Sequence, residues 1–253
     1  MTRFEEYAIK YQDMRMERRN GILQVTFHTQ GGPLQWNESA HREFGHAFTD
    51  IGADPDNKVV IMTGTGEAFC ANADIQSFGP INTPRGWDKI YWEGKRLLLN
   101  LLDIEVPMIA AVNGPALVHA ELAVLCDIVL AADTAAFQDA PHFKNGVVPG
   151  DGVHVVWPLL LGTNRGRYFL LTGQKLSAQE ALNLGVVNEV VPRDRLLSRA
   201  WELAEQLVKQ PPLTLRYSRV VLTLQLKRLM QEALGYGLVL EGMGVMDLPG
   251  ARG

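Results

Sequence analysis

A histidine and an aspartate nine positions apart, His142 and Asp151, are the residues best suited to chemistry in this sequence. They lie in the segment Phe137–Trp157, which otherwise consists mostly of Gly, Pro and short apolar residues. The pair Pro149-Gly150 predicts a turn that folds the loop back, so that the two side chains could meet. A carboxylate hydrogen-bonded to an imidazole fixes its tautomer and raises its basicity, as a general base requires. An ordinary surface loop with a solvated histidine and a turn-forming aspartate fits the same stretch equally well.

The composition is that of a globular protein and excludes several functional classes. Of the 253 residues, 47% are hydrophobic and 21% are charged, and the net charge is -4. Without a basic run, this charge argues against non-specific nucleic-acid binding. Cys70 and Cys126 have no CxxC spacing, so they indicate core packing rather than a disulfide or a zinc site. The charged N-terminus and the lack of an apolar run of about 18 residues predict no signal peptide and no membrane span. We therefore expect a cytoplasmic protein.

Patterns typical of strands and helices alternate along most of the chain. These elements must position the side chains of His142 and Asp151. Residues 1–20 are a polar lead-in by composition, and residues 75–86 have the composition of a mobile loop. From Arg193 onward only amphipathic helix patterns follow, so we predict an α/β body at 1–192 and a helical region at 193–253. Helices with apolar faces must pack on the body or on a neighbouring subunit. The patterns typical of strands fall at 21–28, 58–63, 106–112, 127–132 and 185–191, and those typical of helices at 37–50, 87–102 and from 177.

Several segments, in the right order, resemble the crotonase (enoyl-CoA hydratase/isomerase) superfamily. They are Val59–Gly64, Phe69–Asp74, Pro107–Gly114, Glu121–Asp127, Phe137–Gly152, Gly162–Gly173 and Ala178–Val191. The resemblance covers roughly residues 20–250 and implies an α/β spiral of ββα units with a helical C-terminal region. It also implies trimers, often paired into hexamers, and an oxyanion hole of two backbone N–H groups that stabilises an enolate.

The sequence departs from the superfamily pattern at the residues that form this oxyanion hole. Asn72 stands where the pattern has Gly, and Leu117–Ala120 replaces a Gly-rich segment. Because glycine lets backbone donors approach a thioester oxygen closely, these changes argue against a CoA thioester. His142 stands about where hydratases carry one catalytic Glu, and Glu121 stands where they carry the other. The expected substrate is therefore of another class.

At these positions the sequence resembles one branch of the superfamily, 6-oxocamphor hydrolase and related β-diketone hydrolases. That branch opens a CoA-free cyclic 1,3-diketone by hydrolysing a carbon–carbon bond. No metal or other cofactor is expected, since no cluster of ligands appears outside the histidines named below. The segments concerned are Trp36 with His41, Asn113–Pro115 with His119–Glu121, Pro141–Phe143, Pro149–Gly152 and the LVLEGMG that contains Glu241. The resemblance implies His142, Asp151, His119 and Glu241 as catalytic residues, and Trp36, His41 and Ala71 as substrate-binding residues.

These assignments predict a retro-Claisen hydrolysis that gives a keto acid, with other interpretations open. His119 could instead be a packed structural histidine, and Trp36 could be a core residue. Glu121 could cap a helix or form an internal pair. A CoA-thioester enzyme of the hydratase type is the first alternative function. A non-catalytic protein of this fold that binds RNA or a partner is the second. His28, His46 and His154 match no motif and are expected to be structural.

Overall fold

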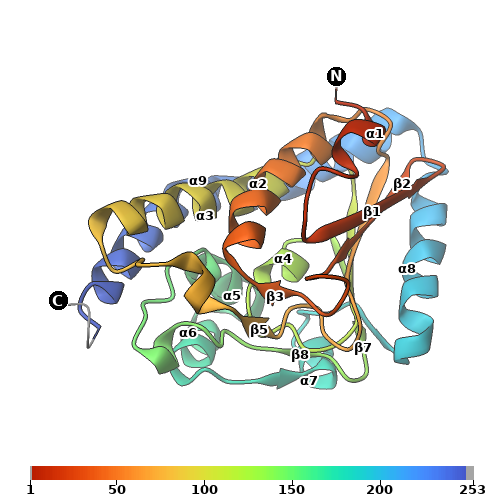
Figure 1. The fold of residues 1–253 in the computed structure, drawn as a ribbon. Helices are drawn as coiled ribbons and strands as arrows, with labels where there is room; N and C mark the ends of the chain where they lie inside the picture. The colour runs from red at the N-terminus through yellow and green to blue at the C-terminus, as the bar shows by residue number, and fades with distance from the viewer. Residues whose placement is uncertain (1, 249–253) are drawn as a thin grey trace.

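The computed structural model describes residues 2–248, which form a mixed α/β fold around one central sheet (Figure 1). The six strands lie in the order β1-β2-β4-β6-β7-β10. Only the β1–β2 pair is antiparallel, and every other pair in this sheet is parallel. This confirms the predicted α/β class. The strands are β1 (Met14–Arg19), β2 (Ile22–Phe27), β4 (Val59–Gly64), β6 (Met108–Val112), β7 (Ile128–Ala132) and β10 (Glu189–Val191).

Both faces of the sheet are buried, which explains the apolar runs of its central strands. On β4, Val59 and Ile61 belong to the core that α8 (Arg193–Leu207) covers, while Val60 and Met62 belong to the core on the opposite face. That opposite face packs against α2 (Glu38–Ala53) and α3 (Pro84–Leu102). In Figure 1, α8 accordingly lies on one side of the strands, with α2 and α3 on the other.

Three local expectations were wrong. Residues 1–20 are not only a lead-in, because β1 is an edge strand in which buried methionines alternate with charged residues. The segment 75–86 contains a 3-10 turn and the start of α3, which begins early because the Thr83 side chain accepts from the backbone N–H of Gly86. The end of the stretch 137–157 is the first turn of α5 (Val153–Leu161) rather than loop.

The remaining elements are short. Two small sheets pair β3 with β5 and β8 with β9. A capping box of Ser177 and Glu180 begins α7. These elements are α1 (Phe4–Tyr7), β3 (Gln35–Trp36), β5 (Asn72–Ala73), η1 (Ile75–Phe78), α4 (Glu121–Val124), β8 (Ala136–Phe137), η2 (Phe143–Asn145), α6 (Thr163–Thr172), β9 (Leu176–Ser177) and α7 (Ala178–Asn183).

The C-terminal region is helical through α9 (Pro212–Val245), with no strand after β10 in the part of the chain that the structure describes. Met230, Leu234 and Leu238 of α9 join the main core, and buried Arg219 forms an ion pair with Asp127 at 2.5 Å. Both helices therefore pack on the body. None of the described helices is long and apolar enough to cross a membrane. Residues 249–253 of the predicted helical region lie outside the described residues.

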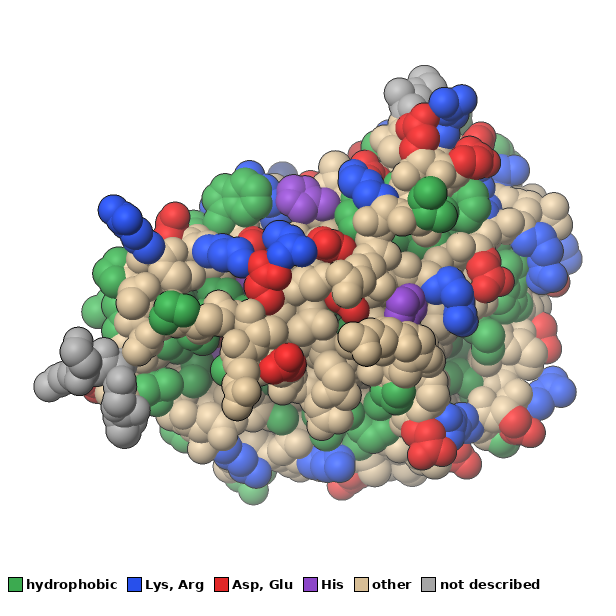
Figure 2. Space-filling view, viewed as in Figure 1, with side chains coloured by type: hydrophobic (Ala, Val, Ile, Leu, Met, Phe, Trp, Pro, Cys, Tyr) green, Lys and Arg blue, Asp and Glu red, His purple; other side chains and the backbone are tan. Residues whose placement is uncertain are grey.

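The surface charge is mixed in sign. In Figure 2, Lys and Arg side chains lie among Asp and Glu side chains, and on the face shown no basic stripe crosses the molecule. This matches the net charge of -4. Helix α9 nevertheless exposes large apolar side chains, among them Leu222, which is 78% exposed.

Candidate active site

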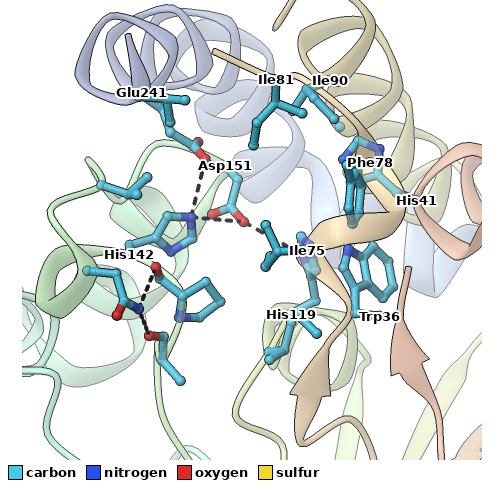
Figure 3. Close-up of a pocket in the computed structure, with 18 of the residues that line it drawn as sticks. Trp36, His41, Ile75, Phe78, Ile81, Ile90, His119, His142, Asp151 and Glu241 are labelled. Carbon is cyan, nitrogen blue, oxygen red and sulfur yellow. Dashed lines mark hydrogen bonds and ion pairs between the residues drawn. The ribbon is translucent and has the colours of Figure 1, made fainter. Parts of the chain in front are cut away.

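All seven residues predicted from the sequence line one cavity of about 780 Å³ (Figure 3). The cavity lies between the ends of the strands, the loop that carries His142, and helices α3 and α9. Its other walls are largely apolar, and they include Ile75, Phe78, Ile81, Ile90, Leu97 and Val245. The polar groups therefore converge in an otherwise hydrophobic pocket, which is the usual form of a small-molecule site. The predicted residues are Trp36, His41, Ala71, His119, His142, Asp151 and Glu241.

His142 is held by a carboxylate that the sequence did not indicate. Its Nδ1 lies 2.5 Å from Oδ1 of Asp139, and both residues are only 4% exposed. The loop around the ring is fixed because Asn145 Nδ2 donates to the carbonyls of Ala140, at 2.9 Å, and Pro141, at 3.0 Å. With Nδ1–H donated to Asp139, the Nε2 of His142 is the nitrogen that faces the cavity.

Asp151 faces the other ring nitrogen of His142, Nε2. The prediction that Asp151 orients the His142 ring therefore needs correction. Its Oδ2 lies 3.5 Å from Nε2 of His142 and 3.6 Å from Nδ1 of His119. The two residues meet as expected, but Asp139, not Asp151, orients the ring. Asp151 comes just before the N-terminus of α5, where the helix dipole favours negative charge. Burial would raise the pKa of Asp151, but the positive charges of His142 and His119 outweigh burial and lower it.

The carboxylates around His142 make it strongly basic. Burial alone lowers the pKa of an imidazole, but Asp151, Asp139 and Glu241 outweigh it and hold the pKa of His142 well above 6.5. Glu241 Oε1 lies 3.4 Å from Nε2 of His142. Burial raises the pKa of Glu241 to about 7, against the opposing effect of His142. The site therefore holds groups that can exchange protons near neutral pH.

Two glycines bring Glu241 of α9 next to Asp151. A Cβ at Gly150 would lie 2.2 Å from the carbonyl oxygen of Gly237, and a Cβ at Gly237 would lie 2.2 Å from the His154 ring. Neither position therefore has room for a side chain. Glu241 follows Gly237 by one helical turn and so lies on the same face of α9, above the 149–152 loop. Figure 3 shows its carboxylate pointing toward His142 and Asp151.

His119 enters the cavity from a left-handed backbone conformation with φ of 46°. Few non-glycine residues adopt such a conformation, His among those that do so more often, and it is found at functional sites that other contacts stabilise. Here Nδ1 of His119 lies 2.5 Å from Oε1 of buried Glu121, and the ring lies 4.0 Å from Trp36 between centroids. Burial lowers the pKa of His119, but the charges of Glu121 and Asp151 outweigh it and raise the pKa above 6.5. Glu121 thus pairs internally, one of the alternatives that the sequence left open.

His41 and Trp36 form the wall beside His119. The buried His41 ring bonds Glu93 of α3 through Nδ1 at 3.0 Å, and its ring centroid lies 6.4 Å from that of His119. Burial lowers the pKa of His41. Trp36 is only 3% exposed, so it is both a core residue and part of the cavity wall. None of the three histidines expected to be structural, His28, His46 and His154, is among the residues that line the cavity.

Within residues 2–248, two groups of side chains lie close enough together to hold a metal ion, although the sequence predicted none. The first group is His119, Glu121 and Asp151, and the second is His142, Asp151 and Glu241.

The carboxylate partners of two histidines, Asp139 for His142 and Glu93 for His41, were not predicted from the sequence. The spacing of Asp139, three residues before His142, was a usable local signal. Glu93 is 52 positions from His41, and no local pattern joins them.

Comparisons with known proteins match this fold over nearly its whole length. The family model for enoyl-CoA hydratase/isomerase matches residues 17–238. A short-chain-enoyl-CoA hydratase from Clostridium acetobutylicum is 32% identical over 206 residues, which are 81% of this chain and 78% of that enzyme. A carnitinyl-CoA dehydratase from Citrobacter koseri is 38% identical over 68% of this chain and 66% of its own length.

Two solved structures give the same architecture. One is a β-diketone hydrolase from the cyanobacterium Anabaena sp. PCC 7120, bound to (S)-3-oxocyclohexyl acetic acid. It is 56% identical with a TM-score of 0.95, and the match covers 96% of this chain and 97% of that one. The other is an enoyl-CoA hydratase/isomerase from Mycobacterium paratuberculosis, 26% identical with a TM-score of 0.86, matched over 93% of this chain and 94% of that one.

Proposed function

Since this chain belongs to the enoyl-CoA hydratase/isomerase family of the crotonase superfamily, we propose that it is a β-diketone hydrolase. The proposed reaction is the hydrolysis of a carbon–carbon bond in a cyclic 1,3-diketone, which gives a keto acid. The observation that carries this proposal is the placement of Asp151 between the imidazoles of His142 and His119, in an otherwise apolar cavity. Two imidazoles on one carboxylate can serve both halves of such a reaction.

The chemistry requires a carbanion that is stable enough to leave. In a 1,3-diketone, the departing carbon becomes an enolate through the second carbonyl group. Water adds to one carbonyl carbon, and the tetrahedral intermediate collapses by breaking the carbon–carbon bond. One carbonyl becomes the carboxylic acid, and the enolate takes up one proton to become the ketone. The reaction therefore needs a base for water on one side and a proton donor on the other.

His142 is the proposed base. Asp139 holds Nδ1–H, so a neutral His142 presents the lone pair of Nε2 to the cavity. Nε2 lies 3.4 and 3.5 Å from carboxylate oxygens of Glu241 and Asp151, so a water can donate one hydrogen to one of these oxygens and the other to Nε2. A water bonded to these oxygens would be within reach of Nε2. Glu241 and Asp151 would thus orient the nucleophile, and His142 would take its proton.

His119 is the proposed donor to the leaving enolate. Its Nδ1 donates to Glu121, and the charges of Glu121 and Asp151 raise its pKa, which shifts it toward the imidazolium form. An imidazolium can hold the enolate oxygen and then supply the proton, which a backbone N–H cannot. Trp36 packs on this ring, so the ketone end of the substrate is expected beside Trp36 and His119.

The substrate class is proposed to be bicyclic. A cyclohexanone with an acetic acid arm, as bound to the Anabaena enzyme, has the connectivity left after hydrolysis of a bridged bicyclic 1,3-diketone. A compact cavity of about 780 Å³ with largely apolar walls suits such a hydrocarbon frame.

The competing function is a reaction on a CoA thioester, since the hydratase and dehydratase relatives are named for such reactions. Two observations argue against a CoA-thioester reaction. The backbone N–H of Val118, in the segment where the superfamily has its oxyanion hole, already donates to the carbonyl of Cys70. The side chain of His119 lines the cavity next to Val118. The test is incubation with monocyclic and bicyclic 1,3-diketones and, separately, with crotonyl-CoA. We expect loss of diketone absorbance and appearance of a keto acid by NMR. Turnover of crotonyl-CoA with no diketone consumed would reject the proposal.

Assembly and location are also proposals. The exposed apolar side chains of α9 support a homotrimer or hexamer, because a solvated helix seldom carries so many. The expected setting is the cytoplasm, with no nucleic-acid or membrane partner.

A further inference from the structure

The separations between the ligand atoms of His142, Asp151 and Glu241 are longer than hydrogen bonds. Nε2 of His142 lies 3.5 Å from Asp151 Oδ2 and 3.4 Å from Glu241 Oε1, and all three ligand atoms lie within 4.8 Å of one another. Charge-assisted hydrogen bonds are about 2.7–2.9 Å long. Donor atoms about 2.0–2.1 Å from a tetrahedral Zn²⁺ are about 3.4 Å apart, because the edge of a tetrahedron is about 1.6 times its radius. The two separations measured from Nε2 of His142 match that edge.

The second group, His119, Glu121 and Asp151, does not have this geometry. Nδ1 of His119 and Oε1 of Glu121 are 2.5 Å apart, so a proton shared between them already satisfies both atoms. A metal ion would have to separate that pair. The two groups share Asp151, so only one of them can use it. Because His119 and Glu121 already contact each other, the His142 group is the favoured metal site.

The surroundings of His142 are those of a metal ligand. A ligating histidine almost always donates its other ring N–H to a carboxylate or carbonyl, which fixes the ring and makes the ligating nitrogen more basic. Asp139 does this to Nδ1 of His142 at 2.5 Å. This outer contact is independent of the three ligand atoms, and it presents Nε2 to them.

One oxygen of each of the two carboxylates, Asp151 and Glu241, has no hydrogen-bond partner. Glu241 is only 7% exposed, lines the cavity, and has no hydrogen-bond partner for Oε2. Asp151 Oδ1 is likewise buried without a partner. Three carboxylates, those of Asp139, Asp151 and Glu241, surround one imidazole. A dication bound to Nε2 of His142 would be stabilised by the charges of these carboxylates.

We propose that His142, Asp151 and Glu241 bind one divalent transition-metal ion of the Zn²⁺ or Co²⁺ type. Imidazole with carboxylates suits these ions, whereas Mg²⁺ prefers oxygen ligands alone. All three residues line the cavity, so a fourth coordination position points into it. The bound ion uses the Nε2 that the base needs, so it inhibits hydrolysis reversibly. That inhibition rests on the proposed function, whereas the binding site does not.

The test is titration of the EDTA-treated protein with ZnCl₂ and, separately, with MgCl₂ by isothermal calorimetry. We expect one Zn²⁺ per chain and no comparable Mg²⁺ binding. Glu241→Gln should abolish this binding, and Asp139→Asn should weaken it about 10–100-fold. His46→Gln is the matched control, because it removes an exposed histidine outside the cavity and should leave the affinity unchanged. Both cysteines are buried and so do not compete for the ion.

A second measurement keeps the test valid if a variant fails to fold. Co²⁺ added to the wild-type protein should give the intense visible absorption of a tetrahedral ion, and Zn²⁺ should displace it. Zn²⁺ affinity that is unchanged in Glu241→Gln, or a weak octahedral Co²⁺ spectrum, would overturn the site. Tight Zn²⁺ binding with no diketone turnover in the metal-free protein would reject the proposed function alone.

Discussion

Replacing Asp139 by Asn is the perturbation that best separates the structure from the pairing expected from sequence. The Asp139 carboxylate accepts Nδ1–H of His142 at 2.5 Å. An amide of the same shape can instead turn its NH₂ group toward Nδ1. The ring would then carry its proton on Nε2, the nitrogen that must accept a proton from water.

The expected loss follows from the tautomer. The same carboxylate-to-amide change beside a catalytic histidine lowers kcat about 10⁴-fold in serine proteases. For Asp139→Asn we expect kcat/KM to fall about 10²–10⁴-fold, which is about 3–5 kcal/mol of transition-state stabilisation. The fold should survive, because burial already raises the pKa of Asp139 and its Oδ2 has no partner. We expect the free energy of unfolding to fall by no more than about 2 kcal/mol.

The assay is steady-state hydrolysis of a bicyclic diketone, with thermal unfolding measured on the same samples. Asp133→Asn is the control, since Asp133 is exposed in the same region and lies outside the cavity. The double variant Asp139→Asn/His142→Ala should be no worse than His142→Ala alone, because the two residues act as one unit. Near-normal kcat/KM in Asp139→Asn, with the fold intact, would refute the assignment of Asp139 as the positioning residue.

Three further outcomes are expected. His119→Ala should lower kcat about 10²–10³-fold, the usual effect of removing one donor to an oxyanion, and in D₂O the new CH₂ carbon should lose stereochemical control; a normal kcat with a single-handed product would make His119 a packing residue. The acid limb of kcat/KM should lie well above pH 6.5, because the carboxylates raise the pKa of His142 and only neutral His142 accepts a proton; flat activity down to pH 5 would contradict this. Light scattering should show a trimer or hexamer, and Leu222→Glu, which places a charge on an exposed apolar residue of α9, should weaken it; a wild-type monomer at micromolar concentration would argue against the assembly.

The parts of the fold that could be predicted from sequence are those whose burial leaves a one-dimensional pattern. Strand β4 is buried on both faces, so its sequence is a continuous apolar run. Strand β1 is an edge strand, and its alternation of Met with Arg and Glu was taken for a polar lead-in. Helix α5 begins with VHVV after a glycine at φ of 108° and contains Pro158, so local propensity did not indicate a helix.

The candidate site shows the same division at the level of single atoms. The Pro149-Gly150 turn was sufficient to predict that Asp151 meets His142. It could not predict which ring nitrogen Asp151 would face, because that depends on the 3-10 turn after His142 and on a partner three residues earlier. The contact of Glu241 with the site depends on a close helix crossing at Gly150 and Gly237, which are far apart in sequence.

The left-handed backbone at His119 links the family fold to the proposed chemistry. The superfamily pattern has glycines in this segment, and glycine adopts positive φ without strain. This chain keeps φ at 46° with a histidine, at a cost of the order of 1 kcal/mol that contacts with Glu121 and Trp36 offset. In the proposed mechanism, the donor to the enolate is therefore a side chain that can carry a positive charge and not only a backbone N–H. An enolate released from a broken carbon–carbon bond needs both a hydrogen bond and a proton, and the imidazolium of the proposed mechanism would provide both.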